Sequence, residues 1–185
     1  MHRALMEIFE EINSREILAA ITALLAVMIA LTPRFGFIGI LSVIIGFLVH
    51  EAAHRQAARS VGCSSRFVAD PLGIIITLLS ALLPIVILAP GYVAIACPWG
   101  PPSRRGVLKI SAAGPLSNIL LAVIGVALWE AGFTYARTFA LINSWLALFN
   151  LIPAGPLDGA KVLRASFSTW AVMTVLAIIL FYICW

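Results

Sequence analysis

Apolar residues run along this chain in long blocks that are separated by short polar or proline-containing breaks. Five of the blocks approach the roughly 20 residues that a helix needs to cross the hydrocarbon core of a bilayer. The five predicted membrane helices are Ile17–Thr32, Phe35–Ala58, Lys109–Glu130, Phe133–Leu151 and Ser166–Trp185. The pattern therefore predicts an all-α polytopic membrane protein, a helical bundle of five to six transmembrane segments.

A sixth apolar block, Pro71–Ala96, has two interpretations. It can cross the membrane as a full span near Leu72–Ala89. It can instead enter the membrane and return to the same side, because Pro84, Pro90 and Gly91 interrupt it. In the second case its end looks extended and can pair with another strand.

The positions of the basic residues favour the re-entrant interpretation of this block. A full span divides the twelve Lys and Arg residues equally between the two faces. A returning segment leaves only Arg34 and Arg137 on one face and the other ten on the face that holds the N-terminus. Since Lys and Arg concentrate on the cytoplasmic side of membrane proteins, we expect no net crossing. Irregular backbone at membrane depth lines a cavity, so the segment is expected to border a site.

The composition agrees with a single membrane domain over residues 1–185. Hydrophobic residues make up 62% and charged residues 11% of the chain, whereas soluble domains are about half apolar and about a quarter charged. Residues 1–16 have apolar positions at helical spacing and predict an amphipathic N-terminal segment lying at the interface. Residues 35–164 are expected to form the core of this domain, and 166–185 the final helix.

Charge and cysteine content exclude some partners and cross-links. The net charge is +4, but no basic run interleaved with aromatic residues is present, so we expect no nucleic-acid partner. Cys63, Cys97 and Cys184 are odd in number and widely spaced. That spacing predicts free thiols rather than a metal-binding pair or a disulfide framework.

The strongest chemical signal is the sequence His50-Glu51-Ala52-Ala53-His54. Residues four apart lie on the same face of a helix, one turn apart, so two imidazoles can share one metal ion. Glu51 projects away from that face and can act on a metal-bound water as general base. Ionisable groups are costly inside a membrane span and usually mark a functional site.

A third protein ligand is needed, with a fourth position left open for water. Asp158 lies in a stretch with two prolines and two glycines, Asn150–Gly159, which must unwind the helix end. Its alternative role is to cap the last helix. Asp70, at the start of the re-entrant block, is the second candidate ligand, whereas Glu130 is expected at the opposite membrane face.

Smaller polar residues surround these candidates. Ser111, Gly114, Pro115 and Asn118 form a stripe on the fourth helix that can pack closely against the metal-binding helix. Asn118 can also contact a substrate or orient a ligand. Asn150 can polarise the scissile carbonyl or hold the broken backbone, and the residues alone do not separate these roles.

Three motifs, HEAAH, AGPLSN and NLIPAGPLDG, occur in this order within about Phe47–Leu163. Together they resemble the site-2 protease family of intramembrane zinc metalloproteases, in a minimal form without PDZ or CBS domains. The resemblance implies one Zn²⁺ held by His50, His54 and Asp158, with Glu51 as catalytic base. It matches Asn150 to the asparagine of the family's last motif.

The resemblance also implies cleavage of transmembrane protein substrates in regulated intramembrane proteolysis. We expect a multi-pass protein of a prokaryotic plasma membrane, in contact with the lipid bilayer, with its active site toward the cytoplasm. The alternative is a non-hydrolytic membrane protein that binds or transports metal, because such proteins also use buried His and Asp. The sequence predicts neither the substrate's identity nor the oligomeric state.

Overall fold

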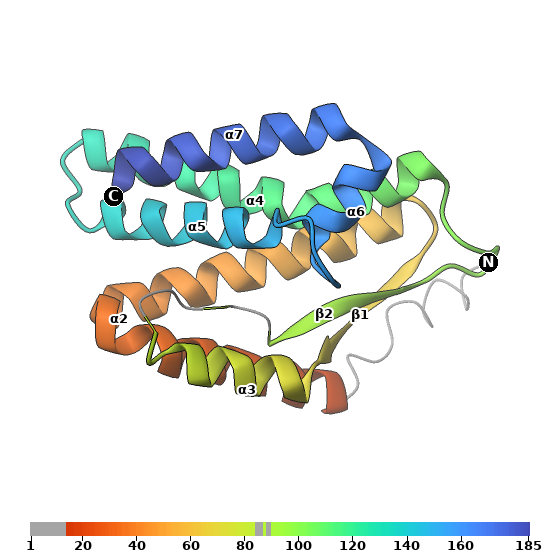
Figure 1. Cartoon of the computed structure of the whole chain (residues 1–185), viewed down its shortest axis with the longest axis horizontal. Helices are drawn as coiled ribbons and strands as arrows, with labels where there is room; N and C mark the ends of the chain where they lie inside the picture. Colours follow the sequence, from red (N-terminus) through yellow and green to blue (C-terminus); the bar gives the residue numbers. More distant parts are fainter. Residues whose placement is uncertain (1–13, 84–86, 88–89) are drawn as a thin grey trace, which may run out of the picture.

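The computed structural model describes residues 14–83, 87 and 90–185, and it is mostly helical (Figure 1). Most of the predicted amphipathic segment 1–16 thus lies outside the described residues. In chain order the elements are α2 (Ser14–Ser60), β1 (Ser64–Ala69), α3 (Pro71–Ser80), β2 (Gly91–Ala96), α4 (Arg104–Glu130), α5 (Ala136–Asn150), α6 (Asp158–Ala165) and α7 (Phe167–Cys184).

Helix α2 consists of two arms joined by a sharp bend at Gly36. The backbone there is not helical, with φ of 57° and ψ of −156°, a region that glycine enters without the steric penalty of a side chain. The two arms fold back along each other (Figure 1). The first and second predicted membrane helices therefore exist as separate segments, and the bend replaces the break expected between Thr32 and Phe35.

All five predicted membrane helices are helical, but they differ in length. Among the described residues, three are long and apolar enough to cross a bilayer, namely Gly36–Ser60, Arg104–Glu130 and Phe167–Cys184. The first arm of α2 contains a shorter apolar helix, Ile17–Ala30, and α5 has 15 residues. A mostly helical architecture with three candidate spans is confirmed, and the count of five to six remains a prediction.

The last residues of the sixth apolar block lie next to the residues just before its start. Strands β1 and β2 pair antiparallel, with Ala69 opposite Gly91, so the all-α prediction is wrong for β1, which was not expected. The short helix α3 lies between them, and Asp70 caps its start by accepting a hydrogen bond from the Gly73 amide. The Asp70 amide donates to the Pro90 carbonyl at 3.0 Å. The extended end expected for this block is thus confirmed.

The prediction of free thiols is wrong for Cys63 and Cys97, which form a disulfide. The cause is the register of the hairpin. Ser64 pairs with Ala96, so the next residues outward on each strand face one another, with their Cα atoms 4.3 Å apart. Their separation of 34 residues in the sequence gave no sign of this contact, because it depends on strand pairing. Cys184 is free and buried.

Helices α4, α5 and α7 pack against one another as a three-helix bundle, and α2 with the hairpin lies along one side of it (Figure 1). Small residues allow this close packing: a Cβ atom added at Gly125 on α4 would lie 2.9 Å from the Cβ of Ala140 on α5. One buried cluster joins α2 to α5 through Val27, Ala30, Val43, Ile142, Leu146 and Phe149. The polar site described below lies beside this cluster.

We predict that thiol labelling will distinguish the disulfide from free cysteines. Protein purified without reductant, then denatured and treated with a maleimide, should gain one label, at Cys184. Protein that is reduced before labelling should gain three labels, as counted by mass spectrometry. Cys63→Ser should show two reactive thiols without reductant. Closing a loop of this length stabilises a fold by about 4 kcal/mol in the chain-entropy model, so reduction should also lower the melting temperature. Three labels before reduction would contradict the pairing.

Candidate metal centre

The second arm of α2 places two imidazole rings side by side in the interior. His50 and His54 are one helical turn apart, and their ring centroids are 4.7 Å from one another. Both residues are buried, with 6% and 2% of their surface exposed. The Nε2 atoms of the two rings lie 3.0 Å apart and face the same space. The spacing in the sequence thus produces the convergent pair that it predicted.

The other nitrogen of each ring is held by helix α4. His54 Nδ1 lies 2.8 Å from the carbonyl oxygen of Ile110. His50 Nδ1 lies 2.6 Å from Asn118 Oδ1. A carbonyl oxygen only accepts hydrogen bonds, so both rings carry their proton on Nδ1 and leave the Nε2 lone pair free. Such a partner fixes both the tautomer and the orientation of a histidine that binds metal.

Asn118 is itself fixed by a buried polar network. Its Nδ2 donates to the Gly46 carbonyl and to Asn143 Oδ1, each at 3.1 Å. Asn143 donates in turn to the Phe139 carbonyl. Asn118 and Asn143 are completely buried, and every link in this chain has a partner, which is the condition under which a buried network stabilises a structure. The orientation of His50 therefore depends on α2, α4 and α5 together.

Gly114 on α4 lies directly against the two imidazoles. A Cβ atom built at this position would collide with the Nε2 atoms of both His50 and His54. Only glycine lets the α4 backbone approach this closely. The predicted stripe of small residues is thus a contact surface for the histidines themselves, and Pro115 beside it is buried in the same helix.

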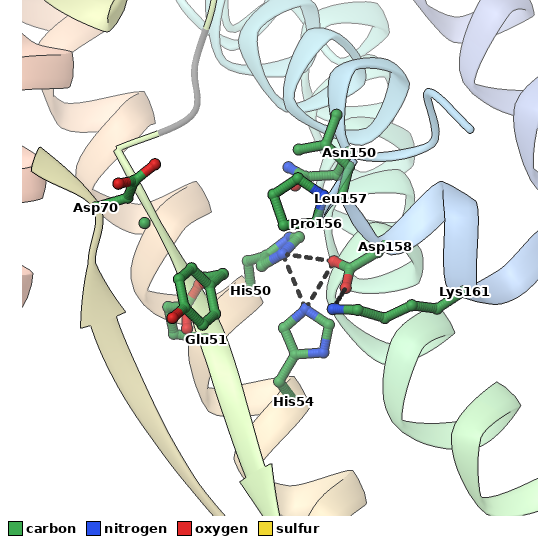
Figure 2. A pocket seen from close by; sticks show the side chains of 11 residues that line it. His50, Glu51, His54, Asp70, Asn150, Pro156, Leu157, Asp158 and Lys161 are labelled. Atoms are coloured by element: carbon green, nitrogen blue, oxygen red, sulfur yellow. Dashed lines mark hydrogen bonds and ion pairs between the residues drawn. The ribbon is translucent and has the colours of Figure 1, made fainter. Parts of the chain in front are cut away.

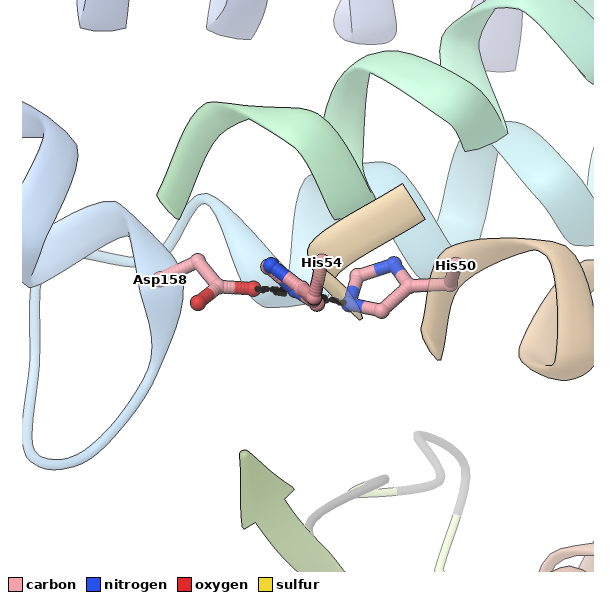
Figure 3. Close-up of side chains that lie close together, drawn as sticks. All are labelled: His50, His54 and Asp158. Carbon is pink, nitrogen blue, oxygen red and sulfur yellow. Dashed lines mark hydrogen bonds and ion pairs between the residues drawn. The ribbon is translucent and has the colours of Figure 1, made fainter. Parts of the chain in front are cut away.

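Asp158 reaches the histidines from the far end of the chain. Its Oδ2 lies 2.9 Å from His54 Nε2 and 3.4 Å from His50 Nε2, and Figure 3 shows the three side chains converging. Asp158 is the first residue of α6, and Leu157 is the capping position, which makes no side-chain hydrogen bond. The alternative prediction, that Asp158 only caps this helix, is therefore wrong.

The loop before α6 brings Asp158 into place through a second close contact. A Cβ atom at Gly159 would collide with the backbone carbonyl of Leu151, so this residue must be glycine for α6 to begin here. Gly155 has a φ of 54°, which glycine adopts without strain. The broken backbone predicted from the prolines and glycines is confirmed, and it carries the carboxylate inward.

These three side chains can hold a metal ion. One ligand atom from each of His50, His54 and Asp158 lies within 4.8 Å of the others, and all three residues are buried. Tetrahedral zinc with bonds of about 2.0–2.1 Å requires ligand atoms about 3.3 Å apart. The separations of 2.9–3.4 Å between the Nε2 and Oδ2 atoms are close to that value. Two neutral imidazoles and a carboxylate are also a donor set that zinc uses.

The second oxygen of Asp158 faces a positive charge. Lys161 Nζ lies 3.6 Å from Asp158 Oδ1, and Figure 2 shows the lysine reaching along the carboxylate from one turn further on α6. This charge favours the ionised form of the carboxylate, and it leaves Oδ2 as the oxygen that faces the histidines.

Glu51 and Asn150 border two adjoining cavities at this centre. The larger, about 70 Å³, is lined by polar groups that include Asp70, Asp158 and Lys161 (Figure 2). The smaller is about 50 Å³. Among the described residues, the buried Glu51 Oε2 has no hydrogen-bond partner. An unpaired carboxylate oxygen beside a cavity is able to accept a proton from a water molecule.

Two predicted residues take other positions. Asp70 lines the larger cavity but caps α3 and does not belong to the three-residue group. Asn150 donates through Nδ2 to the Leu146 carbonyl one turn earlier and borders both cavities. It therefore supports the end of α5 beside the centre.

Sequence reasoning did not identify Asn143 and Lys161. Asn143 is seven residues before Asn150, which places both on the same face of α5. Lys161 follows Asp158 by three residues, the spacing at which side chains on a helix meet. Either spacing would have revealed the residue once the neighbouring motif was assigned.

Comparison with curated proteins finds several relatives that are named as putative zinc metalloproteases. The chain is 33% identical to "Putative zinc metalloprotease MJ0611" of Methanocaldococcus jannaschii, over 91% of this chain and 93% of that protein. It is 30% identical to "Putative zinc metalloprotease YwhC" of Bacillus subtilis, over 68% and 67% of the two chains. "Putative zinc metalloprotease Rip3" of Mycobacterium tuberculosis is 32% identical over 69% of this chain and 30% of its own length. No protein-family model and no solved structure matches the chain.

We predict that Gly114→Ala will weaken metal binding because the added methyl group displaces the imidazoles. Zinc affinity, measured by competition with a chromophoric chelator, should fall by at least about 10–100-fold, the loss typical of a disturbed metal surrounding. Gly106→Ala on the same helix is the matched control, since its Cβ would meet Pro102 at 3.2 Å and needs only a small adjustment. If Gly114→Ala and Gly106→Ala bind zinc with equal affinity, the close packing of α4 against the histidines does not determine the positions of the ligands.

Proposed function

The chain belongs to the site-2 protease family of zinc metalloproteases, and from this premise we propose that it hydrolyses peptide bonds within transmembrane segments of substrate proteins. The observation that carries the proposal is the convergence of Asp158 Oδ2 on the Nε2 atoms of His50 and His54. His54 and Asp158 are 104 residues apart in the sequence. The three residues meet beside a cavity that is also lined by Glu51, one of whose oxygens is unpaired.

In this proposal His50, His54 and Asp158 hold one Zn²⁺, and the cavity provides the open position. Bound zinc lowers the pKa of a water molecule toward 7 and polarises a carbonyl group. The two Nδ1 hydrogen bonds to Asn118 and Ile110 keep the imidazoles oriented. Lys161 holds Asp158 so that one oxygen faces the ion.

Glu51 moves the protons of the reaction. Its Oε2 accepts a proton from the attacking water while the oxygen of that water bonds to the carbonyl carbon. When the carbon–nitrogen bond breaks, Glu51 passes the same proton to the leaving amine. The net change is the addition of one water across the peptide bond, and Glu51 ends in the state in which it began.

Asn150 is proposed to support the substrate carbonyl. A side-chain amide has two N–H donors, and one of them already binds the Leu146 carbonyl. That bond fixes the amide at the edge of both cavities, so the second N–H can donate to a carbonyl oxygen that gains negative charge. Asn150 then serves both functions left open by the sequence.

The membrane arrangement belongs to the same proposal. The three long apolar helices support a multi-pass protein. The distribution of basic residues favours a metal centre toward the cytoplasmic side, in what we propose is a prokaryotic plasma membrane. The adjoining ends of β1 and β2 support a re-entrant path for residues 71–96. The chain 1–185 is then one domain whose catalytic core, 35–164, is followed by the final helix.

The competing hypothesis is a membrane protein that binds or transports metal without hydrolysis. It explains the buried ligands but gives no reason for a buried, unpaired glutamate oxygen beside them. The two hypotheses differ in what they require of Glu51, because a carrier needs only the ligands.

We predict that Glu51→Gln will retain zinc and lose proteolysis. The amide cannot accept the proton of water, so cleavage of a reporter membrane segment by purified protein should fall by about 10²–10⁴-fold. Zinc content, measured by mass spectrometry of the metal, should stay at one ion per chain. Equal cleavage by wild type and Glu51→Gln would reject the protease hypothesis.

We predict that Asp158→Asn and Asp70→Asn will separate the third ligand from a residue that only lines the cavity. Both substitutions remove one carboxylate charge from the same cavity. Asp158→Asn and His54→Ala should lower zinc affinity by more than the roughly 10–100-fold that loss of a supporting partner costs. Asp70→Asn should retain zinc and still cap α3, because asparagine caps helices well. If Asp70→Asn loses the ion and Asp158→Asn keeps it, the ligand assignment is wrong.

A further inference from the structure

The smaller cavity is not used by the mechanism above. Its apolar wall consists of Val27 and Val43 on α2, Phe47 further along the same helix, and Leu146 on α5. Val27, Val43 and Leu146 belong to the buried cluster between α2 and α5. We call this space the apolar pocket.

The apolar pocket adjoins the reaction site directly. It shares His50, Glu51, Gly91 and Asn150 with the larger, polar cavity. The proposed base and the proposed carbonyl donor therefore stand at the boundary between two spaces of different character. One space contains Asp158, Lys161 and Asp70. The other has the apolar wall on the side away from these charges, and its remaining polar group is the Asn118 amide.

An extended peptide would use both spaces at once. Successive side chains of an extended chain point to opposite faces. If the bond between two residues lies at Glu51 and Asn150, one of these residues directs its side chain to the polar cavity. The other directs its side chain to the apolar pocket.

The volume sets the size of the side chain that fits. A void needs about 10–15 Å³ of this measure to hold one water molecule, so about 50 Å³ has room for a group of a few heavy atoms. A leucine side chain has four carbon atoms and a valine side chain three. The ring systems of phenylalanine and tryptophan exceed this space.

The wall is also held firmly. The Phe47 ring packs edge-to-face against Phe67 on β1, with centroids 5.5 Å apart. Val43 and Val27 are buried with 0% and 3% of their surface exposed. A rigid wall discriminates by size, because a larger side chain cannot push it back without disturbing the packed cluster.

We propose that the apolar pocket is the specificity subsite for an aliphatic side chain of valine or leucine size, carried by one of the two substrate residues that flank the cleaved bond. The inference rests on the proposed proteolysis and adds a rule for where the substrate is cut. The flanking residue on the other side faces the polar cavity and is not restricted to apolar types.

The test compares reporter membrane segments that differ only at the two flanking residues, with the cut site located by mass spectrometry. At one of the two positions, kcat/KM for Val or Leu should exceed that for Gly or Trp by about 10-fold or more, the discrimination expected from a shaped apolar pocket. At the other flanking position, kcat/KM should not depend on side-chain size in this way.

Variants of the wall should change the preferred size in opposite directions. Leu146→Ala enlarges the apolar pocket and should raise the Phe-to-Leu ratio of kcat/KM by about 10-fold. Val27→Leu narrows it and should shift the preference to Ala. Met173→Ala removes a buried side chain from a different cluster, on α7, and should leave the ratios unchanged. If either wall variant fails to fold, the other still tests the proposal.

Peptide binding to zinc-loaded Glu51→Gln gives a readout that does not need cleavage. Peptides with Leu at the selected position should bind at least about 10-fold more tightly than those with Trp, and Leu146→Ala in this background should remove the difference. If peptides with Leu bind more tightly than those with Trp but the wild-type protein cleaves none of the reporters, the proposed function is wrong and the subsite proposal still stands. If Leu146→Ala and Val27→Leu leave the size preference unchanged, both in kcat/KM and in peptide affinity, the subsite proposal is wrong. The space would then hold a lipid chain or be an internal void.

Discussion

The contact between α4 and the two imidazoles of α2 is the interaction on which the metal centre depends. Ile110, Gly114 and Asn118 are spaced four residues apart, as are His54 and His50, so the two helices match turn for turn. Ile110 and Asn118 each bind one Nδ1 atom, and Gly114 provides the space between them. The geometry of both ligands is therefore set by one helix–helix packing, in a setting where an unsatisfied imidazole would be costly.

The carboxylate arrives by a different route, and its charge is balanced locally. The unwound stretch after α5 lets α6 begin with Asp158 facing inward, and Gly159 allows this start to lie against Leu151. Lys161 on the next turn contacts the outer oxygen. One short helix thus supplies both the anionic group that faces the histidines and a positive charge beside its other oxygen.

The sequence predicted this centre better than it predicted the hairpin, for a physical reason. His50, Glu51 and His54 depend on helical periodicity, which is local, and the breaks around Asp158 depend on proline and glycine. The pairing of Ser64 with Ala96, and with it the contact of Cys63 with Cys97, depends on which strands meet and in what register. The link from Asn118 to Asn143 depends on how α4 packs on α5. Neither is encoded within a single stretch of chain.

The hairpin is fastened at two points, by the disulfide at its outer end and by the Asp70–Pro90 hydrogen bond where α3 departs. A covalent tether keeps the two strands at a high effective concentration for one another. If lipid or an incoming polypeptide displaces α3, β2 cannot diffuse away, and re-pairing is a ring closure rather than a search. Gly91, which borders both cavities, would then return to the same register, and the shape that selects a side chain would be preserved.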